Sequence, residues 1–268
     1  MTADVAPEVA GAPVFTPAPG AAPLPRMIAA QARLETRTLL RNGEQLLLTL
    51  VIPLLLLVAF GLEPLVNLGT GMKRIDFLTP GIIALAVMST AFTSQAIATG
   101  FERRYGVLKR LGATPLSRPG LIAAKTVTVI AVELLQGALI LIVAVAIGWR
   151  PDASPSAVVV VPLLILLGTA AFSGLALLMA GTLRAEATLA GANLVYIVLL
   201  GVGGVIFPLA KFPAGARPVL ELLPTGALST GLRDVLQLGT AFPAKDAITL
   251  AVWAAVAIAA AARMFRWE

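Results

Sequence analysis

The sequence contains no cysteine and no histidine, and only 13% of its 268 residues are charged. Without cysteine it can form no disulfide and perform no thiol chemistry. Without histidine it lacks the usual metal ligand and the usual acid–base group for neutral pH. We therefore expect no metal site and no catalytic residue, and we do not expect the chain to be an enzyme.

The shortage of charge accompanies a large excess of apolar residues. Hydrophobic residues make up 58% of the chain and the mean hydropathy is +0.93, whereas a soluble domain has about a quarter charged residues. The isoelectric point near 10.3 could suggest nucleic acid, but the basic residues cluster at the ends of apolar segments, where membrane orientation explains them. The composition predicts an all-α polytopic membrane protein that binds no nucleic acid.

Six apolar segments are candidates to cross a bilayer, because about 17–25 residues are needed to do so as a helix. With both termini inside, thirteen basic residues fall on the cytoplasmic side and seven outside, which favours an N-in, C-in topology. Glycines in the fourth and fifth segments, among them Gly174 and Gly201, should allow close helix packing. The expected transmembrane domain is 46–268, with spans at 46–62, 77–99, 121–148, 157–183, 187–207 and 247–262.

Three regions outside the spans have their own character. Residues 1–25 are rich in alanine and proline and predict a disordered cytoplasmic tail. Residues 26–45 predict a basic amphipathic helix on the inner leaflet, with Gly43 as its stop. Four prolines divide the segment 208–245 into pieces too short to span, which predicts short re-entrant helices on the outer side.

The loop 101–119 between the second and third spans is the most informative segment. Its charges suit a cytoplasmic loop, but its apolar residues also recur at helical spacing, which predicts a docking helix that begins at Glu102. Gly112 can end this helix, and Ser117 is a suitable N-cap for the third span. The candidate docking residues are Phe101, Glu102, Arg103, Arg104, Tyr105, Val107, Leu108, Lys109, Arg110 and Leu111.

Two runs resemble a known family. The run ERRYGVLKRLGATPLSRPGLIAAK (102–125) resembles the E-R-x-x-G-x-L-x-x-L-x-x-T/S-P-L pattern, followed by a lysine, of ABC-2-type transporter permeases. The run GVIFPLAKFPAGARPVLELLPTGALSTGLRDVL resembles the stretch between spans five and six of the same family. With six spans in an N-in, C-in topology, the resemblance covers about residues 26–268, and it is most similar to the drug-exporter, daunorubicin-resistance branch.

The resemblance implies a six-helix ABC-2 (type V exporter-like) fold in the bacterial cytoplasmic membrane. It also implies a permease dimer, homomeric or heteromeric, on two cytoplasmic ABC ATPase subunits, which would hold ATP and magnesium while this chain holds no cofactor. The loop 101–119 would be the coupling helix and 26–45 the connecting helix. No G-x-x-x-x-G-K-[ST] run occurs in the sequence, which supports separate ATPase subunits.

Polar residues within the predicted spans are candidates for a substrate pathway. Glu133 lies near the middle of the third span, with Gln136 one turn away, and a mid-membrane charge should face protein or water. It would contact a cationic substrate, or else hydrogen-bond a neighbouring helix such as one bearing Gln95 or Asn193. The candidate pathway residues are Glu133, Gln136, Gln95 and Asn193.

Several functions stay open at this point. The first is the export of drugs or other hydrophobic and amphipathic compounds, and the closest alternative is export of a lipid-linked glycan or cell-wall precursor. An ion-coupled secondary transporter would need no ATPase. A membrane-embedded enzyme would need a catalytic constellation that Glu133, the only acid deep in a predicted span, cannot form alone.

Overall fold

The computed structural model describes residues 20–62 and 72–265, and throughout these ranges the ordered elements are helices. The side chains of Glu44 and Leu48 are not described, and most of the expected N-terminal tail, residues 1–19, lies outside the described ranges. The helices are α1 (Leu24–Leu40), α2 (Gly43–Leu46), η1 (Leu47–Val51), α3 (Ile52–Leu62), α4 (Arg74–Met88), η2 (Ser89–Ser94), α5 (Gln95–Arg104), α6 (Val107–Gly112), α7 (Arg118–Ala146), α8 (Ala157–Thr182), α9 (Ala185–Val202), η3 (Leu209–Lys211), α10 (Arg217–Glu221), α11 (Pro224–Gln237) and α12 (Ala244–Met264).

Five helices are long and apolar enough to cross a membrane, so the chain is a multi-pass membrane protein. They are the continuous helix Arg74–Arg104, which joins α4, η2 and α5, and the helices α7, α8, α9 and α12. The first expected span corresponds to a shorter apolar helix, Thr49–Leu62. Six spans with both termini inside therefore stay a prediction.

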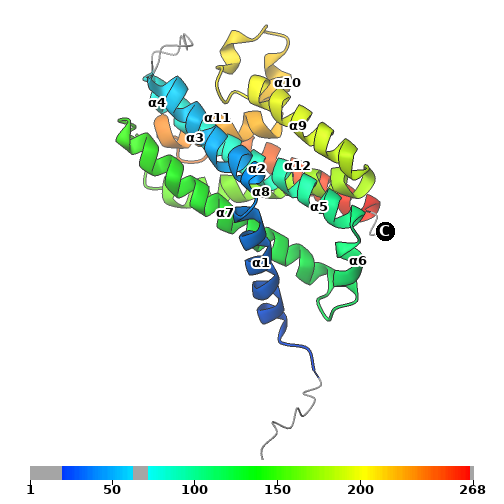
Figure 1. Ribbon diagram of the computed structural model, residues 1–268. Helices are drawn as coiled ribbons and strands as arrows, with labels where there is room; N and C mark the ends of the chain where they lie inside the picture. Colours follow the sequence, from blue (N-terminus) through cyan, green and yellow to red (C-terminus); the bar gives the residue numbers. More distant parts are fainter. Residues whose placement is uncertain (1–19, 63–71, 266–268) are drawn as a thin grey trace, which may run out of the picture.

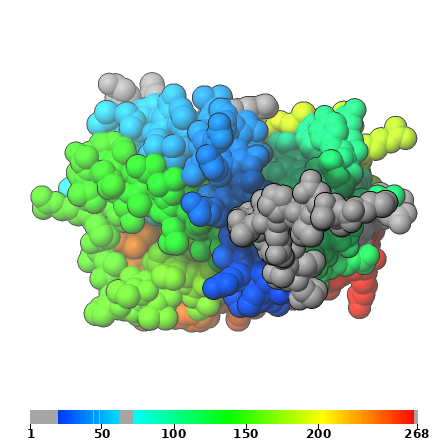
Figure 2. Space-filling model, turned by 60° about the horizontal axis from the view of Figure 1, so that its bottom comes forward, coloured from blue at the N-terminus to red at the C-terminus, as the bar shows by residue number. Residues whose placement is uncertain are grey.

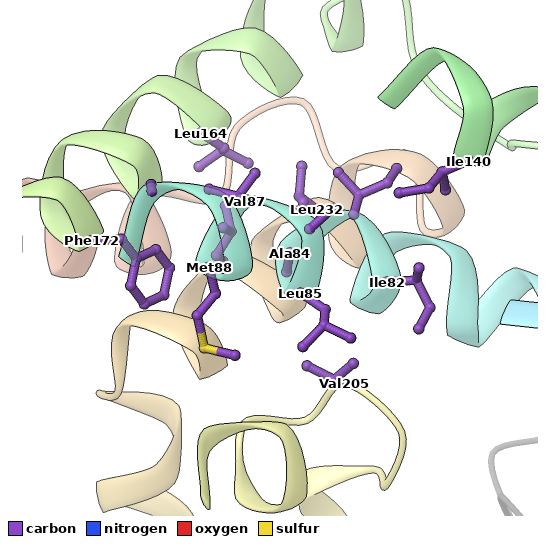
Figure 3. Close-up of a cluster of buried hydrophobic side chains, with 14 of the residues drawn as sticks. Ile82, Ala84, Leu85, Val87, Met88, Ile140, Leu164, Phe172, Val205 and Leu232 are labelled. Atoms are coloured by element: carbon purple, nitrogen blue, oxygen red, sulfur yellow. The ribbon is translucent and has the colours of Figure 1, made fainter. Parts of the chain in front are cut away.

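The helix Arg74–Arg104 passes through the middle of the bundle (Figure 1). In its most apolar stretch 94% of the residues are buried, against 22–39% for the other four candidate spans. Side chains of α4 form one buried cluster with other helices, in which Val87 lies beside Leu164 of α8 and Leu85 lies beside Val205 (Figure 3). This helix is the core around which the other helices pack.

The helix α1 leaves the bundle and lies across α7 (Figure 1). Ala32 is its one fully buried residue, and its carbonyl accepts a hydrogen bond from the Thr128 hydroxyl at 3.2 Å. The expected stop at Gly43 is wrong: α1 ends at Leu40 and Gly43 begins α2. The turn between them uses Arg41 and Asn42, whose backbone N–H groups bond to carbonyls of the last turn of α1.

The segment after α9 closes the opposite end of the bundle with three short helices. The helix α11 is buried along most of its length and packs against α4, α8 and α12. Its Arg233 stacks over the Phe77 ring at 3.8 Å and donates to the Gly204 carbonyl at 3.0 Å. Burial lowers the pKa of the Arg233 guanidinium to about 10, so it remains a cation at neutral pH and ties α11 to α4.

Close packing of α8 and α12 depends on Gly174. A Cβ atom there would lie 2.8 Å from the Ala257 Cβ and 2.9 Å from the Ile258 backbone nitrogen. At Gly201, by contrast, a Cβ atom would meet no described atom within 4 Å. The sequence-based expectation of close packing is therefore confirmed for Gly174, whereas no described helix packs closely against Gly201.

The substitution Gly174→Ala is expected to destabilise the protein by about 1–3 kcal/mol, because the added methyl group would overlap the α12 backbone. Gly137→Ala on α7 is the matched control, since a Cβ there meets no described atom within 4 Å and alanine favours the helix. Thermal unfolding in detergent should show a lower midpoint for Gly174→Ala only. Equal midpoints for the two variants would contradict this account of the α8–α12 contact.

Candidate functional site

The end of α5 carries three consecutive charged residues, and each contacts a different neighbouring helix. Glu102 Oε2 accepts a hydrogen bond from Lys125 Nζ of α7 at 2.6 Å. The same ammonium lies 3.4 Å from Glu35 Oε1 of α1. Lys125 is only 6% exposed, and a buried ammonium needs such carboxylate partners to offset its lost hydration. The contact joins α5, α7 and α1, and we call these three residues the ion triad.

Arg103 contacts the end of α8. Its guanidinium donates to the Gly181 carbonyl at 2.6 Å and to the Leu183 carbonyl. The last carbonyls of a helix have no partner within it and carry the negative end of its dipole, so an arginine there both satisfies and stabilises them. Arg103 thereby fixes the end of α5 to the turn between α8 and α9.

Arg104 contacts the start of α9 through an ion pair with Glu186. The two side chains are 49% and 61% exposed, and such exposed pairs contribute little to stability. Glu186 lies in the first turn of α9, where a negative charge suits the helix dipole. This third contact is the weakest of the set.

The expected docking helix is not continuous. The helix of the second span runs through to Arg104, so Glu102 lies near its C-terminal end instead of opening a new helix. Gly106 then takes φ +68°, a left-handed conformation that glycine adopts readily, and the six-residue helix α6 follows. The sequence-based expectation is wrong on where the helix begins, whereas Ser117 does accept a hydrogen bond from Gly120 N–H at the start of α7.

The break at Gly106 sorts the candidate docking residues into exposed and buried ones. Tyr105 is 63% exposed and stacks on the Phe101 ring, with centroids 6.0 Å apart. Leu108 is only 3% exposed and is part of the packed interior, while Phe101, Val107 and Leu111 are half-buried. The exposed surface, which we call the α6 surface, consists of Arg104, Tyr105, Lys109 and Arg110.

The polar residues within the spans do not converge on one site. Glu133 Oε2 accepts a hydrogen bond from the Thr169 hydroxyl of α8 at 2.7 Å, so its partner is neither Gln95 nor Asn193. Gln136 bonds to the Thr90 hydroxyl of η2 at 2.8 Å and donates to the Thr49 carbonyl. Their role in a substrate pathway stays a prediction.

A cavity of about 300 Å³ lies between α1, the η2–α5 stretch and α7. The ion triad lines it, as does Gln95, the one candidate pathway residue among its lining side chains. Figure 2 shows the molecule from below, and there the blue N-terminal helices cross the middle of the surface beside the green atoms of α7. The cavity therefore adjoins the contacts that hold the end of α5.

Several of these contacts were not foreseen from the sequence. Glu35, Glu186 and the carbonyls at the end of α8 gave no local signal, because their partners lie far along the chain. Lys125 did give a local signal, because it is the lysine that follows the 102–116 run. Its partners follow from the packing of α1 and α5 against α7.

Comparison with known proteins relates the chain to one family. A family model described as ABC-2 type transporter matches residues 28–236, from α1 to the last residues of α11. No curated protein matches the chain. The matched range contains the ion triad, the α6 surface and the cavity.

The substitution Lys125→Met is expected to destabilise the protein by about 3–5 kcal/mol, because it leaves two carboxylates in the interior without their cation. Lys245→Met is the matched control, since it removes the exposed Lys245–Glu221 pair and should cost about 1 kcal/mol or less. Denaturant unfolding in detergent measures both. Equal losses for the two variants would show that the ion triad contributes no more than a surface pair.

Proposed function

We propose that this chain, which belongs to the ABC-2 type transporter family, is the permease of an ATP-binding cassette exporter. Its cargo would be hydrophobic or amphipathic compounds such as drugs or antibiotics, moved outward across the bacterial cytoplasmic membrane. Two separate ATPase subunits would bind ATP and magnesium, since the sequence contains no G-x-x-x-x-G-K-[ST] run. A second permease, identical or different, would complete the transporter.

The observation that carries this proposal is the attachment of the α5 end to four other helices. Glu102 reaches α7 and, through Lys125, α1. Arg103 and Arg104 reach the end of α8 and the start of α9. A force applied at the α6 surface would therefore act on most of the bundle at once, which is what a coupling element must do.

The chemistry of the α6 surface suits a protein partner. Tyr105 offers an aromatic ring that is polar at its tip, and Lys109 and Arg110 offer exposed cations beside it. Tyrosine and arginine are enriched at the energetic centres of protein interfaces. We infer that this surface enters a groove on the ATPase that is apolar at its base and acidic at its rim.

Transport requires the ATPase to bind the two states of the permease with different affinities. Closure of the ATP-bound subunits would shift α6, and the continuous helix Arg74–Arg104 would carry that shift into the centre of the bundle. We favour small amphipathic cargo over a lipid-linked glycan because α11 fills the end of the bundle opposite α6.

The substitution Tyr105→Asp is expected to weaken ATPase binding by about 10-fold or more, because it removes an exposed aromatic anchor. Co-purification with a cognate ABC ATPase subunit, and a titration in nanodiscs, measure the loss. Tyr105→Phe should bind normally, as should Phe242→Asp, which changes an exposed aromatic residue between α11 and α12. Leu108→Asp is unsuitable because Leu108 is buried. Normal binding by a folded Tyr105→Asp variant would refute the docking role.

The substitution Arg103→Gln is expected to uncouple the two activities: ATPase binding and hydrolysis persist while transport falls by about 10-fold. The reason is that Arg103 contacts α8 within this chain and is not part of the α6 surface. Lys245→Gln is the control for loss of an exposed pair and should change transport little. The measurement is uptake of amphipathic dyes into inverted vesicles, alongside phosphate release. If Arg103→Gln transports normally, transmission through α8 is wrong.

A further inference from the structure

The cavity between α1, the η2–α5 stretch and α7 has features of a ligand site. Its volume of about 300 Å³ is at the lower end of the range for small-molecule pockets. One part of its wall is polar and the other part, which includes Leu39, Ala98 and Val129, is apolar. Such a wall suits a molecule with a polar head and an apolar body.

Three buried polar side chains in this wall have no hydrogen-bond partner within the described chain. The atoms without a partner are Ser94 Oγ, Gln95 Oε1 and Thr99 Oγ1, and each of these residues is at most 8% exposed. Hydroxyls in helices usually bond to the carbonyl four residues back, as the Thr79 and Thr128 hydroxyls do here. A buried polar group without a partner costs about 1–3 kcal/mol, so this part of the wall is poised to bind something polar.

The charges in the wall favour a cation. Two carboxyl groups, Glu35 and Glu102, face a single ammonium, Lys125, so the ion triad has a formal charge of −1 when both carboxyl groups are ionised. Lys125 lies 2.6 Å from Glu102 but 3.4 Å from Glu35. In the described chain the contacts of Glu35, with Lys125 and with the Gln31 amide, are made through Oε1. Glu35 Oε2 is thus available to a second cation.

We propose that this cavity binds an amphipathic compound that carries a primary or secondary ammonium group. The ammonium would pair with Glu35, the Gln95 and Thr99 side chains would hydrogen-bond a neighbouring polar group, and the apolar body would lie against Leu39 and Val129. Such a compound is either a lipid with an amine headgroup or a small amphiphile. The site goes beyond the proposed transport function and does not depend on it, because it needs this chain alone.

Occupancy of the cavity would act on the α5 end. Glu102 and Lys125 belong both to the cavity wall and to the ion triad, and Val107 of α6 also lines the cavity. A second cation beside Glu35 would weaken its attraction to Lys125. The ligand would therefore change how firmly α1 is held to α5 and α7.

The experiment measures binding of decylammonium to the purified full-length chain in phosphatidylcholine nanodiscs, without ATP or any ATPase. Decanol and decanoate have the same chain length and serve as neutral and anionic comparisons. We expect saturable binding of decylammonium that is about 10-fold tighter than either comparison. Equal, non-saturable uptake of all three would overturn the proposal and leave a water-filled cavity.

Two variants locate the site. Glu35→Gln should lower the affinity for decylammonium by about 10-fold and leave decanol unaffected. Ala98→Phe should abolish binding by filling the cavity, whereas Ala138→Phe, on an exposed position of α7, should not. If either variant fails to fold, Thr99→Val takes its place, because it removes the hydroxyl group but keeps the side-chain shape. Wild-type affinity in a folded Glu35→Gln or Ala98→Phe variant would refute the site.

The source of the ligand is decided by adding phosphatidylethanolamine to the nanodiscs. If phosphatidylethanolamine competes with decylammonium, the natural occupant is a lipid headgroup. If it does not compete, the natural occupant is a small amphiphile. Both results keep the ammonium site. Because this experiment measures no transport, it can disprove the ammonium site without disproving the exporter function. A failure of the exporter function would likewise leave the ammonium site untouched.

Discussion

The structure depends on one constraint, the enclosure of the helix Arg74–Arg104 by the rest of the bundle. Its 31 residues extend about 46 Å, at about 1.5 Å per residue, whereas the hydrocarbon core of a bilayer is about 30 Å thick. Its middle must therefore satisfy its polar groups within the protein. Its C-terminal end carries Glu102, Arg103 and Arg104 to the helices around it.

The enclosure gives polar side chains of this helix partners within the protein. Its mean hydropathy of 1.7 is below the 2.5 and 2.4 of α7 and α8 but close to the 1.6 of α9 and the 1.8 of α12, which are far less buried, so hydropathy alone does not identify the enclosed helix. A span that faces lipid gains from apolar side chains, whereas one surrounded by protein can hold serine, threonine and glutamine between its neighbours. The hydrogen bond between Thr90 of η2 and Gln136 of α7 is one such contact.

The three attachments of the α5 end differ in strength, and this difference has a functional meaning. The ion triad is buried, so breaking it leaves charges without partners. The Arg104–Glu186 pair is exposed and weak. Under the proposed function the end of α5 would move together with α1 and α7, while its contact with α9 could break and reform. The proposed ammonium site shares its residues with the buried ion triad, the strongest of the three attachments, so a ligand there would have the largest effect on the position of the α5 end.

Much of the fold could be predicted from the sequence, because span existence and helix ends are set locally. Apolar length marks α7, α8, α9 and α12, and Ser117 marks the start of α7. The loop after the second span could be singled out from its own residues, and its role as a coupling segment stays a proposal. Its geometry could not, because a periodic apolar pattern does not reveal that Gly106 breaks the helix or that Leu108 turns inward.

The sequence by itself determined that the chain is a multi-pass helical membrane protein and which loop carries its distinctive charges. Tertiary structure alone decided which charges pair. Glu35 and Glu102 share Lys125 only because α1 crosses α7 beside the end of α5. Local patterns fix where helices begin and end, but long-range packing fixes their neighbours, and a buried ion pair exists only between neighbours.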